Sequence, residues 1–307
     1  MGRLKLFSLQ DTLPSLPVPK LRSTCEGFLE SVRPLLSDDE FQHTTQIISD
    51  FASAGGQGER LQKALVEMAG KLEVGQSWIE KWWEEDFLRR RGGLPVCGNW
   101  YGLDRIDTPH VTQAERAANL ISGCLRFHRL IKQERLQPLR MMGVVPLCMW
   151  QYRRLFHTCR VPGTEIDTIF TATDYAETRH ISVLCNEEVY AFDVLHKDGT
   201  PLSKAEIIVQ INKIQEMSKH VDVSRGKQPP VGILTTENRT TWAQCRSELL
   251  CAGGGNASSL RTVESAMIML VLEGPSPTTL TEQVGSRHCP FYRPLVPFVM
   301  PPFASMP

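Results

Sequence analysis

The chain has 307 residues, and its 34 Lys+Arg balance its 34 Asp+Glu to a formal net charge of zero at pH 7. This balance argues against a nucleic-acid-binding protein, because such proteins usually carry a basic excess or stripe. Hydrophobic residues make up 41% and charged residues 22%, which is typical of a folded globular protein and too apolar for a disordered one. The length allows about two domains or one large α/β unit. The longest apolar run, 266–272, is far shorter than the ~18 residues of a membrane helix.

The nine cysteines indicate a reducing compartment rather than a disulfide scaffold. Their number is odd and no two have the C-x-x-C spacing, and several lie in apolar segments where a reduced cysteine acts as a small hydrophobe. No metal-binding His/Cys spacing, phosphate-binding glycine loop or nucleophile elbow is present. Neither terminus carries a clear targeting signal. Pattern alone therefore predicts a globular protein without identifying its activity.

The first third of the chain has the periodicity of amphipathic helices. Two capping boxes, Ser37-x-x-Glu40 and Thr112-x-x-Glu115, mark helix starts. Residues 94–109 are predicted to be irregular. The three arginines of 89–91 are expected to complement the dipole at a helix end rather than to clamp a phosphate. The predicted helices cover residues 21–36, 38–51, 59–72, 78–91 and 113–131.

The second half mixes strands and helices. Two β-rich runs, 180–185 and 189–194, are separated by three polar residues and predict a hairpin. Helices followed by a hairpin, and then by alternating helix and strand, indicate an α+β or α/β fold. The further predictions are a tight turn at 197–200, a helix capped by Ser203-x-x-Glu206 to 219, a buried strand at 230–234, a helix at 239–250, a loop at 253–256, a short helix at 258–263 and a strand at 267–272.

The last part of the chain differs from what precedes it. Residues 275–307 hold 8 of the 20 prolines and three charged residues. Prolines at this density disfavour both helices and central strands. We therefore expect two parts, a folded domain over 1–274 and an irregular, proline-rich tail over 275–307.

Several short motifs are specific when they are taken together and in order. An L-P-x-L-P-V-P leader begins at Leu13, and a P-L-x-M-x-Q-Y block that begins at Pro146 is followed by C-R-V-P-G ending at Gly163. These motifs resemble the choline/carnitine acyltransferase family, most closely its short-chain carnitine branch, over roughly residues 10–272. The segments that carry the resemblance are 13–21, 58–65, 78–83, 146–152, 158–163, 192–194, 198–202 and 230–243.

The resemblance implies a fold and a reaction. The family has two similar halves of a fold like chloramphenicol acetyltransferase, with a tunnel between them. It moves an acyl group between coenzyme A and the hydroxyl of carnitine or choline, and a histidine that opens an H-x-x-x-[D/E]-G motif is the general base. The implied partners are therefore small molecules, carnitine and acyl-CoA, with coenzyme A as a co-substrate and no bound cofactor or metal. Mitochondria or peroxisomes are the implied locations.

The histidine motif can be tested on this sequence. None of the eight histidines has Asp or Glu four residues later. His196 has its acid two residues on and matches a turn elsewhere in the family. His288 has Tyr292 where the acid belongs and Arg293 where the glycine belongs, so we reject it as a catalytic residue. The S-T-S segment and the R-T-[E/D]-T motif of the family's second half are also missing. The other histidines are His43, His110, His128, His157, His180 and His220.

Two residues carry over as carnitine-binding candidates. Trp83 matches the second tryptophan of the family's W-W pair, which lines the carnitine pocket. The family has W-W-x-x-x-x-Y-L, whose tyrosine reaches the carnitine carboxylate, whereas here Phe87 stands one residue earlier. Phenylalanine lacks the hydroxyl, and a one-residue shift turns a helical side chain by about 100°.

These observations lead us to expect the N-terminal half of a short-chain carnitine O-acyltransferase, truncated before its catalytic histidine and inactive by itself. Whether the chain is an enzyme stays open. The alternative is a non-enzymatic splice form or partial gene product, which binds a partner or has no function. A weaker alternative is an unrelated α/β interaction protein. A skipped segment or a shifted reading frame would each explain the tail.

Overall fold

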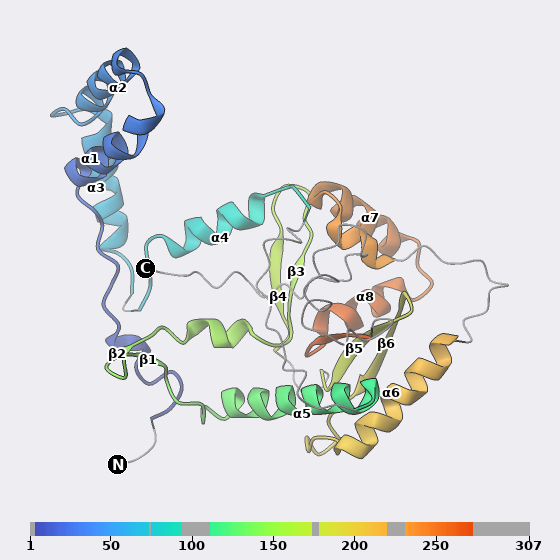
Figure 1. The fold of residues 1–307 in the computed structure, drawn as a ribbon. Helices are drawn as coiled ribbons and strands as arrows, with labels where there is room; N and C mark the ends of the chain where they lie inside the picture. The colour runs from blue at the N-terminus through green and yellow to red at the C-terminus, as the bar shows by residue number, and fades with distance from the viewer. Residues whose placement is uncertain (1–3, 74, 94–110, 174–177, 220–230, 273–307) are drawn as a thin grey trace. The chain divides into compact units, whose positions relative to one another are not determined.

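The computed structural model describes residues 4–73, 75–93, 111–173, 178–219 and 231–272. Helices come first along these residues, and small sheets mixed with further helices follow (Figure 1), in agreement with the expected α+β class. The chain divides into two compact units. The first unit comprises residues 1–7, 87–139 and 149–307, and the second comprises 8–86 and 140–148.

The first unit is built around a three-stranded sheet with the order β6-β5-β7. The central strand β5 (His180–Cys185) pairs antiparallel with β6 (Glu188–Asp193) and parallel with β7 (Met269–Leu272). Nearly every position of β5 is buried, because this strand has a neighbour on each side. Exposed and half-buried positions alternate along β6, so one of its faces looks toward the core.

Two long helices complete the main core. α5 (Gln113–Lys132) and α6 (Lys204–Lys219) pack against each other, and Figure 1 shows them beside the sheet. Residues three or four apart form a single apolar stripe on each helix. The stripe of α5 includes Ile121 and Leu125, and that of α6 includes Ile207 and Ile211, all in one cluster with the side chains of β5.

The remaining elements of the first unit surround the sites described below. β3 (Thr158–Val161) and β4 (Thr168–Thr171) form an antiparallel hairpin. α7 (Arg239–Cys251) and α8 (Asn256–Ser265) precede β7, and 3-10 helices occupy Trp150–Arg154 (η3) and Val231–Thr236 (η5). The last turn of α4 (Glu80–Arg89) also belongs to this unit.

The second unit contains three amphipathic helices, α1 (Leu21–Val32), α2 (Asp38–Phe51) and α3 (Gln57–Ala69). It also holds the 3-10 helices η1 (Gln10–Thr12) and η2 (Arg33–Leu35) and a short hairpin, β1 (Arg140–Met141) with β2 (Val145–Pro146). Its core is thin, and several large apolar side chains on its helices are exposed. They are Phe28, Leu35, Ile47, Leu61 and Val66.

Several local predictions are confirmed. The capping boxes at Ser37 and Thr112 both form, and Ser203 caps α6. The β5–β6 hairpin turns through Asn186 and Glu187, whose positive φ angles suit a two-residue turn. The predicted helices and the predicted strand before residue 272 are also present, with bounds that differ by a few residues.

One prediction is wrong. Residues 231–234 do not form a strand, because Val231–Thr236 form η5. Periodicity cannot separate a strand from a helical turn in so short an apolar run. Neither β3 nor β4 is predicted by the sequence pattern, since each is only four residues long. The predictions for residues 94–109, for Pro230, for the boundary at 274 and for the tail at 275–307 lie outside the described residues.

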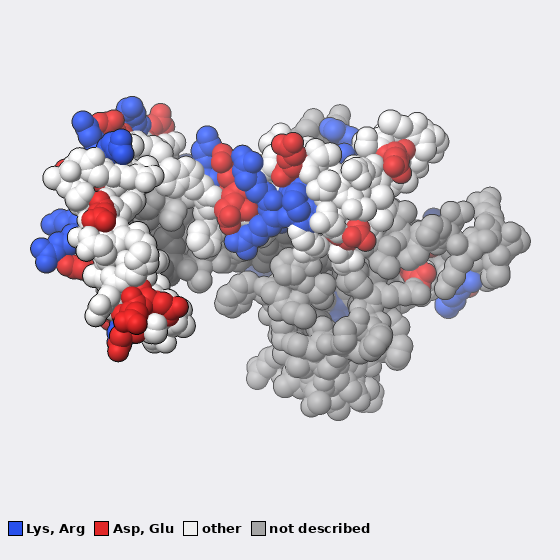
Figure 2. All heavy atoms as spheres, turned by 90° about the horizontal axis from the view of Figure 1, so that it is seen from above, with Lys and Arg blue, Asp and Glu red and all other residues white. Residues whose placement is uncertain are grey.

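The surface charges are mixed in sign. On the face drawn in Figure 2, acidic and basic side chains lie next to each other over much of the described surface. This mixing agrees with the zero net charge of the chain. None of the described helices combines the length and the hydrophobicity that crossing a bilayer requires.

Candidate functional site

Trp83 and Phe87, the two candidate carnitine contacts, both lie on α4. They are four residues apart, so their side chains leave the same side of the helix. Trp83 is 60% exposed. Phe87 is half-buried, and the guanidinium carbon of Arg160 lies 4.4 Å from the centre of its ring. One face of the Phe87 ring therefore packs against protein, whereas the Trp83 indole is available to a ligand.

A buried carboxylate lies beside the C-terminal end of α4. The Oδ2 atom of Asp167 accepts hydrogen bonds from Arg160 Nε at 2.6 Å and from Arg239 Nε at 2.8 Å. Its Oδ1 atom accepts from Arg91 Nη2 at 3.0 Å and from the Gly163 backbone N–H at 3.1 Å. Each carboxylate oxygen thus has two donors, and three of the four are charged groups that form strong hydrogen bonds.

The same cluster caps α4. Arg91 donates to the Leu88 carbonyl, Arg160 Nη2 donates to the Phe87 carbonyl at 3.1 Å, and the Asp167 backbone N–H donates to the Leu88 carbonyl at 3.0 Å. The last carbonyls of a helix lack intrahelical donors and form the negative end of its dipole, so cations are stabilising there. The expected dipole-complementing role of the arginine run is therefore confirmed for Arg91.

The electrostatics of this Asp167 cluster are unbalanced. Burial raises the pKa of Asp167. The Gly163 N–H and the guanidinium groups of Arg239 and Arg160 lower this pKa by more than burial raises it, so the pKa lies below its ordinary value. One carboxylate faces three guanidinium groups. The Nη2 atom of Arg239 is buried and has no hydrogen-bond acceptor among the described residues. The cluster therefore depends on Asp167 remaining charged.

The cluster gives a structural role to the arginines of two segments that carry the family resemblance, 158–163 and 230–243. Arg160 and Gly163 belong to the C-R-V-P-G motif, and Arg239 follows the asparagine that caps α7. Asp167 lies outside every motif that carries the family resemblance, and sequence reasoning missed it. Its sequence signal is weak, because it is one of two acids, with Glu165, in the short loop between β3 and β4.

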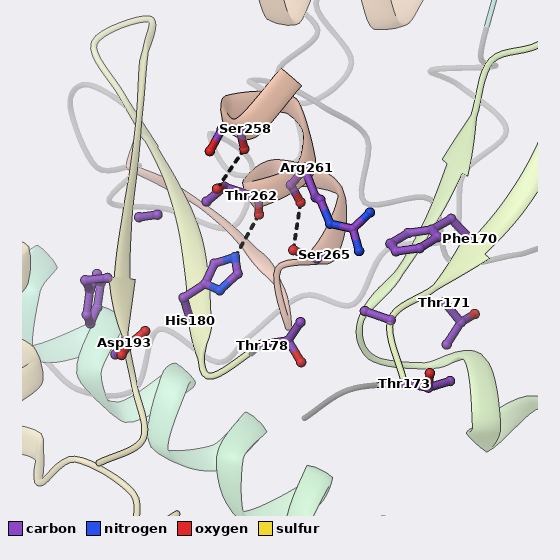
Figure 3. Close-up of a pocket in the computed structure, with 13 residues that line it drawn as sticks. Phe170, Thr171, Thr173, Thr178, His180, Asp193, Ser258, Arg261, Thr262 and Ser265 are labelled. Carbon is purple, nitrogen blue, oxygen red and sulfur yellow. Dashed lines mark hydrogen bonds between the residues drawn. The ribbon is translucent and has the colours of Figure 1, made fainter. Parts of the chain in front are cut away.

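A second feature of the first unit is a cavity of about 600 Å³ between β4, β5, β6 and α8 (Figure 3). Its lining is largely polar, with six hydroxyl side chains, the imidazole of His180 and one charged group of each sign. Such a volume is large enough for a small polar ligand. The residues in question are Thr171, Thr173, Thr178, Ser258, Thr262, Ser265, His180, Arg261 and Asp193.

His180 forms a hydrogen bond at the wall of this cavity. Its Nε2 atom lies 2.7 Å from the Thr262 carbonyl oxygen, and Figure 3 shows the ring turned toward α8. Because a carbonyl oxygen can only accept, Nε2 carries the hydrogen of this bond. Arg261 and Asp193 add one positive and one negative charge to the lining. The cavity therefore offers a polar ligand hydrogen-bond donors and acceptors together with one positive and one negative group.

Two further histidines are buried next to each other. The ring centres of His128, on α5, and His157 are 5.2 Å apart, and His157 Nδ1 lies 3.3 Å from the Ser265 carbonyl oxygen. Burial, together with His157 and Lys132, lowers the pKa of His128 to about 4. Burial also lowers the pKa of His157, and its hydrogen bond to Ser265 only partly opposes this. Both rings are therefore neutral at pH 7.

This pair makes the stability of the chain depend on pH. Between about pH 6.5 and pH 4 the unfolded chain binds protons that the folded His128 does not, so the free energy of unfolding falls as the pH is lowered. We expect a loss on the order of 1–2 kcal/mol across this window. Urea denaturation at a series of pH values measures it. His128→Phe should flatten the dependence and the exposed His43→Gln should not; an unchanged slope in His128→Phe would contradict the assignment.

The structure places five of the eight histidines. His43 is exposed on α2, His128 and His157 are buried, His180 lines the cavity, and His196 lies in the turn before α6. The rejected candidate His288 and two others, His110 and His220, lie outside the described residues. Within the described ranges, no group of three or more His, Cys, Asp or Glu side chains is arranged to hold a metal ion.

Comparison with known proteins gives a consistent result. The family described as Choline/Carnitine o-acyltransferase matches residues 16–292. The chain is 35% identical to carnitine O-acetyltransferase of Homo sapiens, over 94% of this chain and 46% of that protein. It is 33% identical to peroxisomal carnitine O-octanoyltransferase of Mus musculus, over 91% and 45%, and 32% identical to choline O-acetyltransferase of Danio rerio, over 88% and 42%. The chain thus spans less than half the length of these relatives.

Proposed function

Because the chain belongs to the choline/carnitine O-acyltransferase family, we propose that its 307 residues form the N-terminal part of an enzyme that moves a short acyl group between coenzyme A and carnitine. The observation that carries the proposal is the family match over most of the chain. Carnitine as the acceptor is supported by the relatives named for it and by Trp83. The fold resembling chloramphenicol acetyltransferase is part of this proposal.

In this proposal α4 presents Trp83 to carnitine. An indole offers a ring face to the quaternary ammonium group of carnitine and an N–H donor to its carboxylate. Phe87 adds apolar contact but no hydroxyl. The Asp167 cluster contributes by fixing the last turn of α4, since it supplies donors to the carbonyls of Phe87 and Leu88.

Neither the α4 side chains nor the Asp167 cluster supplies the general base in this proposal. A base for this reaction must remove the proton of the carnitine hydroxyl, and imidazole suits that task because its pKa lies near neutral. None of the eight histidines opens the H-x-x-x-[D/E]-G motif. Coenzyme A and carnitine are therefore proposed as ligands of the complete catalytic assembly, and a mitochondrial or peroxisomal location is proposed from the relatives.

A thiol-release assay tests the missing base. The purified chain is mixed with acetyl-CoA, carnitine and a thiol reagent, and thiol release is compared with a reaction that lacks carnitine. We expect no carnitine-dependent release, because none of the eight histidines opens the general-base motif of the family. Release above the carnitine-free control would overturn this part of the proposal.

Calorimetric titration with carnitine tests the role of Trp83. We expect weak binding that Trp83→Ala reduces by about fivefold or more, since exposed cation–π contacts contribute about 0.5–1 kcal/mol and the N–H donor adds to this. Trp82→Ala is the matched control, because Trp82 is an exposed neighbour on the same helix. Equal effects of the two substitutions would contradict the assignment of Trp83.

The alternative is a non-enzymatic product of the same lineage that binds a partner. The observation that favours it is again the missing histidine motif. Carnitine binding without turnover fits the first proposal, whereas stable binding of another protein with no affinity for carnitine would favour the alternative.

A further inference from the structure

The cavity between β4, β5, β6 and α8 contains an arginine whose guanidinium group has no partner among the described residues. Arg261 lines the cavity from α8, and Figure 3 shows its guanidinium group directed toward Phe170. The backbone carbonyl of Arg261 accepts a hydrogen bond from Ser265, but within the described ranges no acceptor binds the guanidinium group. This group stays charged at all ordinary pH values and forms strong hydrogen bonds with anions. Arg261 can therefore bind an anionic ligand.

The acid in the described lining does not neutralise this arginine. Asp193 Oδ2 lies 3.4 Å from Arg179 Nη2, so Asp193 already has a cation of its own. Figure 3 shows Asp193 on the opposite side of His180 from Arg261. The two charges of the lining thus lie at different ends of the cavity, and the end that Arg261 occupies is electropositive.

Two hydroxyl groups of the lining keep their hydrogens available for a ligand. The Thr262 hydroxyl donates to the Ser258 carbonyl at 3.0 Å and the Ser265 hydroxyl donates to the Arg261 carbonyl at 2.7 Å, so these two offer a ligand only acceptors. The hydroxyls of Ser258 and Thr173 have no such acceptor among the described residues. Ser258 lies in the first turn of α8, three residues before Arg261, so both side chains leave the same side of the helix. The dipole at this end of α8 also favours an anion.

We propose that this end of the cavity binds the phosphoryl group of a small phosphate monoester. The guanidinium fork of Arg261 takes two phosphoryl oxygens, and the hydroxyls of Ser258 and Thr173 donate to the third. A carboxylate fits less well, because the fork occupies both of its oxygens and leaves none for the hydroxyls. The Phe170 ring beside Arg261 and the cavity volume of about 600 Å³ leave room for a small organic body attached to the phosphate.

Titration calorimetry with phenyl phosphate tests this site, because the probe joins a phosphoryl group to a small apolar ring. The 307-residue chain is titrated in a phosphate-free chloride buffer at fixed ionic strength, since salt screens an exposed cation. We expect saturable binding with a dissociation constant of about 1 mM or lower. Benzoate has the ring with a carboxylate, and inorganic phosphate has no ring, so each should bind about threefold more weakly or worse.

Substitutions identify the groups that bind the probe. Arg261→Gln should raise the dissociation constant about tenfold or more, because it removes both the charge and the fork, and Arg261→Lys should recover only part of this loss. Ser258→Ala should raise it about twofold or more. Arg126→Gln is the matched control, because Arg126 is exposed on α5 and lies outside the described lining of the cavity. This control should bind phenyl phosphate like the parent chain, and an unchanged melting temperature shows that each variant is folded.

Several outcomes would overturn the proposal. They include the absence of saturable binding in the parent chain and equal losses in Arg261→Gln and Arg126→Gln. Benzoate binding as tightly as phenyl phosphate would overturn the choice of a phosphoryl group. Carnitine and acetyl-CoA are added as competitors and should leave phenyl phosphate bound, whereas displacement by acetyl-CoA would overturn the assignment to a small ester. Because none of these measurements requires acyl transfer, failure of the proposed function and failure of this site are distinguishable.

Discussion

Replacement of Asp167 by asparagine should lower the free energy of unfolding by about 3–5 kcal/mol, because it leaves the guanidinium groups of Arg160, Arg239 and Arg91 without their shared anion. Two of the three arginines are themselves buried. Breaking a buried ionic network by removing one partner costs far more than the intact network contributes. Urea or guanidinium denaturation followed by circular dichroism measures the loss.

A second aspartate provides the control. Asp193 also pairs with an arginine, since its Oδ2 atom lies 3.4 Å from Arg179 Nη2, but both partners are partly exposed. Exposed pairs contribute about 0–1 kcal/mol, so Asp193→Asn should change stability by less than about 1 kcal/mol. Similar values for the two substitutions would show that Asp167 is not the centre of a buried network.

Replacement of Gly163 by alanine should destabilise the chain by about 2–4 kcal/mol. A Cβ atom on Gly163 would lie 2.0 Å from the carbonyl oxygen of Ile166, far inside van der Waals contact. The neighbour is backbone, so no side-chain rotation can relieve the clash. The loop would have to open, and the Gly163 N–H would move away from Asp167 Oδ1. Denaturation measures the loss of stability. Faster hydrogen exchange of the amide at position 163 reports the loss of its hydrogen bond to Asp167.

Gly27 is the matched control for this substitution. It lies within α1, and a Cβ atom there would meet nothing within 4 Å. Alanine favours helix over glycine by about 0.5–1 kcal/mol, so Gly27→Ala should stabilise the chain slightly. A neutral or stabilising result for Gly163→Ala would contradict the steric argument.

The parts of the fold that the sequence predicts correctly are those with strong local signals. Ser37 and Thr112 begin helices because their side chains and the following glutamates satisfy backbone groups of the first turn. The β5–β6 hairpin combines two β-rich runs with a polar turn. Short elements lack such signals. For this reason the apolar run of η5 is predicted to be a strand, and β3 and β4 are not predicted.

The candidate site is less accessible to prediction for a physical reason. Trp83 can be singled out because it belongs to a recognisable local motif. Asp167 becomes significant only when segments distant in sequence, from α4, the β3–β4 hairpin and the start of α7, meet around it. The cavity likewise requires β4, β5, β6 and α8 to be placed together. Neither arrangement has a periodicity or a spacing that a single sequence reveals.

The topology of the central sheet has a consequence for the order in which the chain folds. β5 and β6 are joined by a two-residue turn and can pair within microseconds. β7 is separated from β5 in the sequence by β6, α6, α7 and α8, so its pairing with β5 must close a long loop. Closing so long a loop is entropically costly before any contact compensates it. The hairpin is therefore expected early and the parallel pairing late. Until β7 docks, one edge of β5 remains open to other chains, and the folding intermediate is the species most exposed to aggregation.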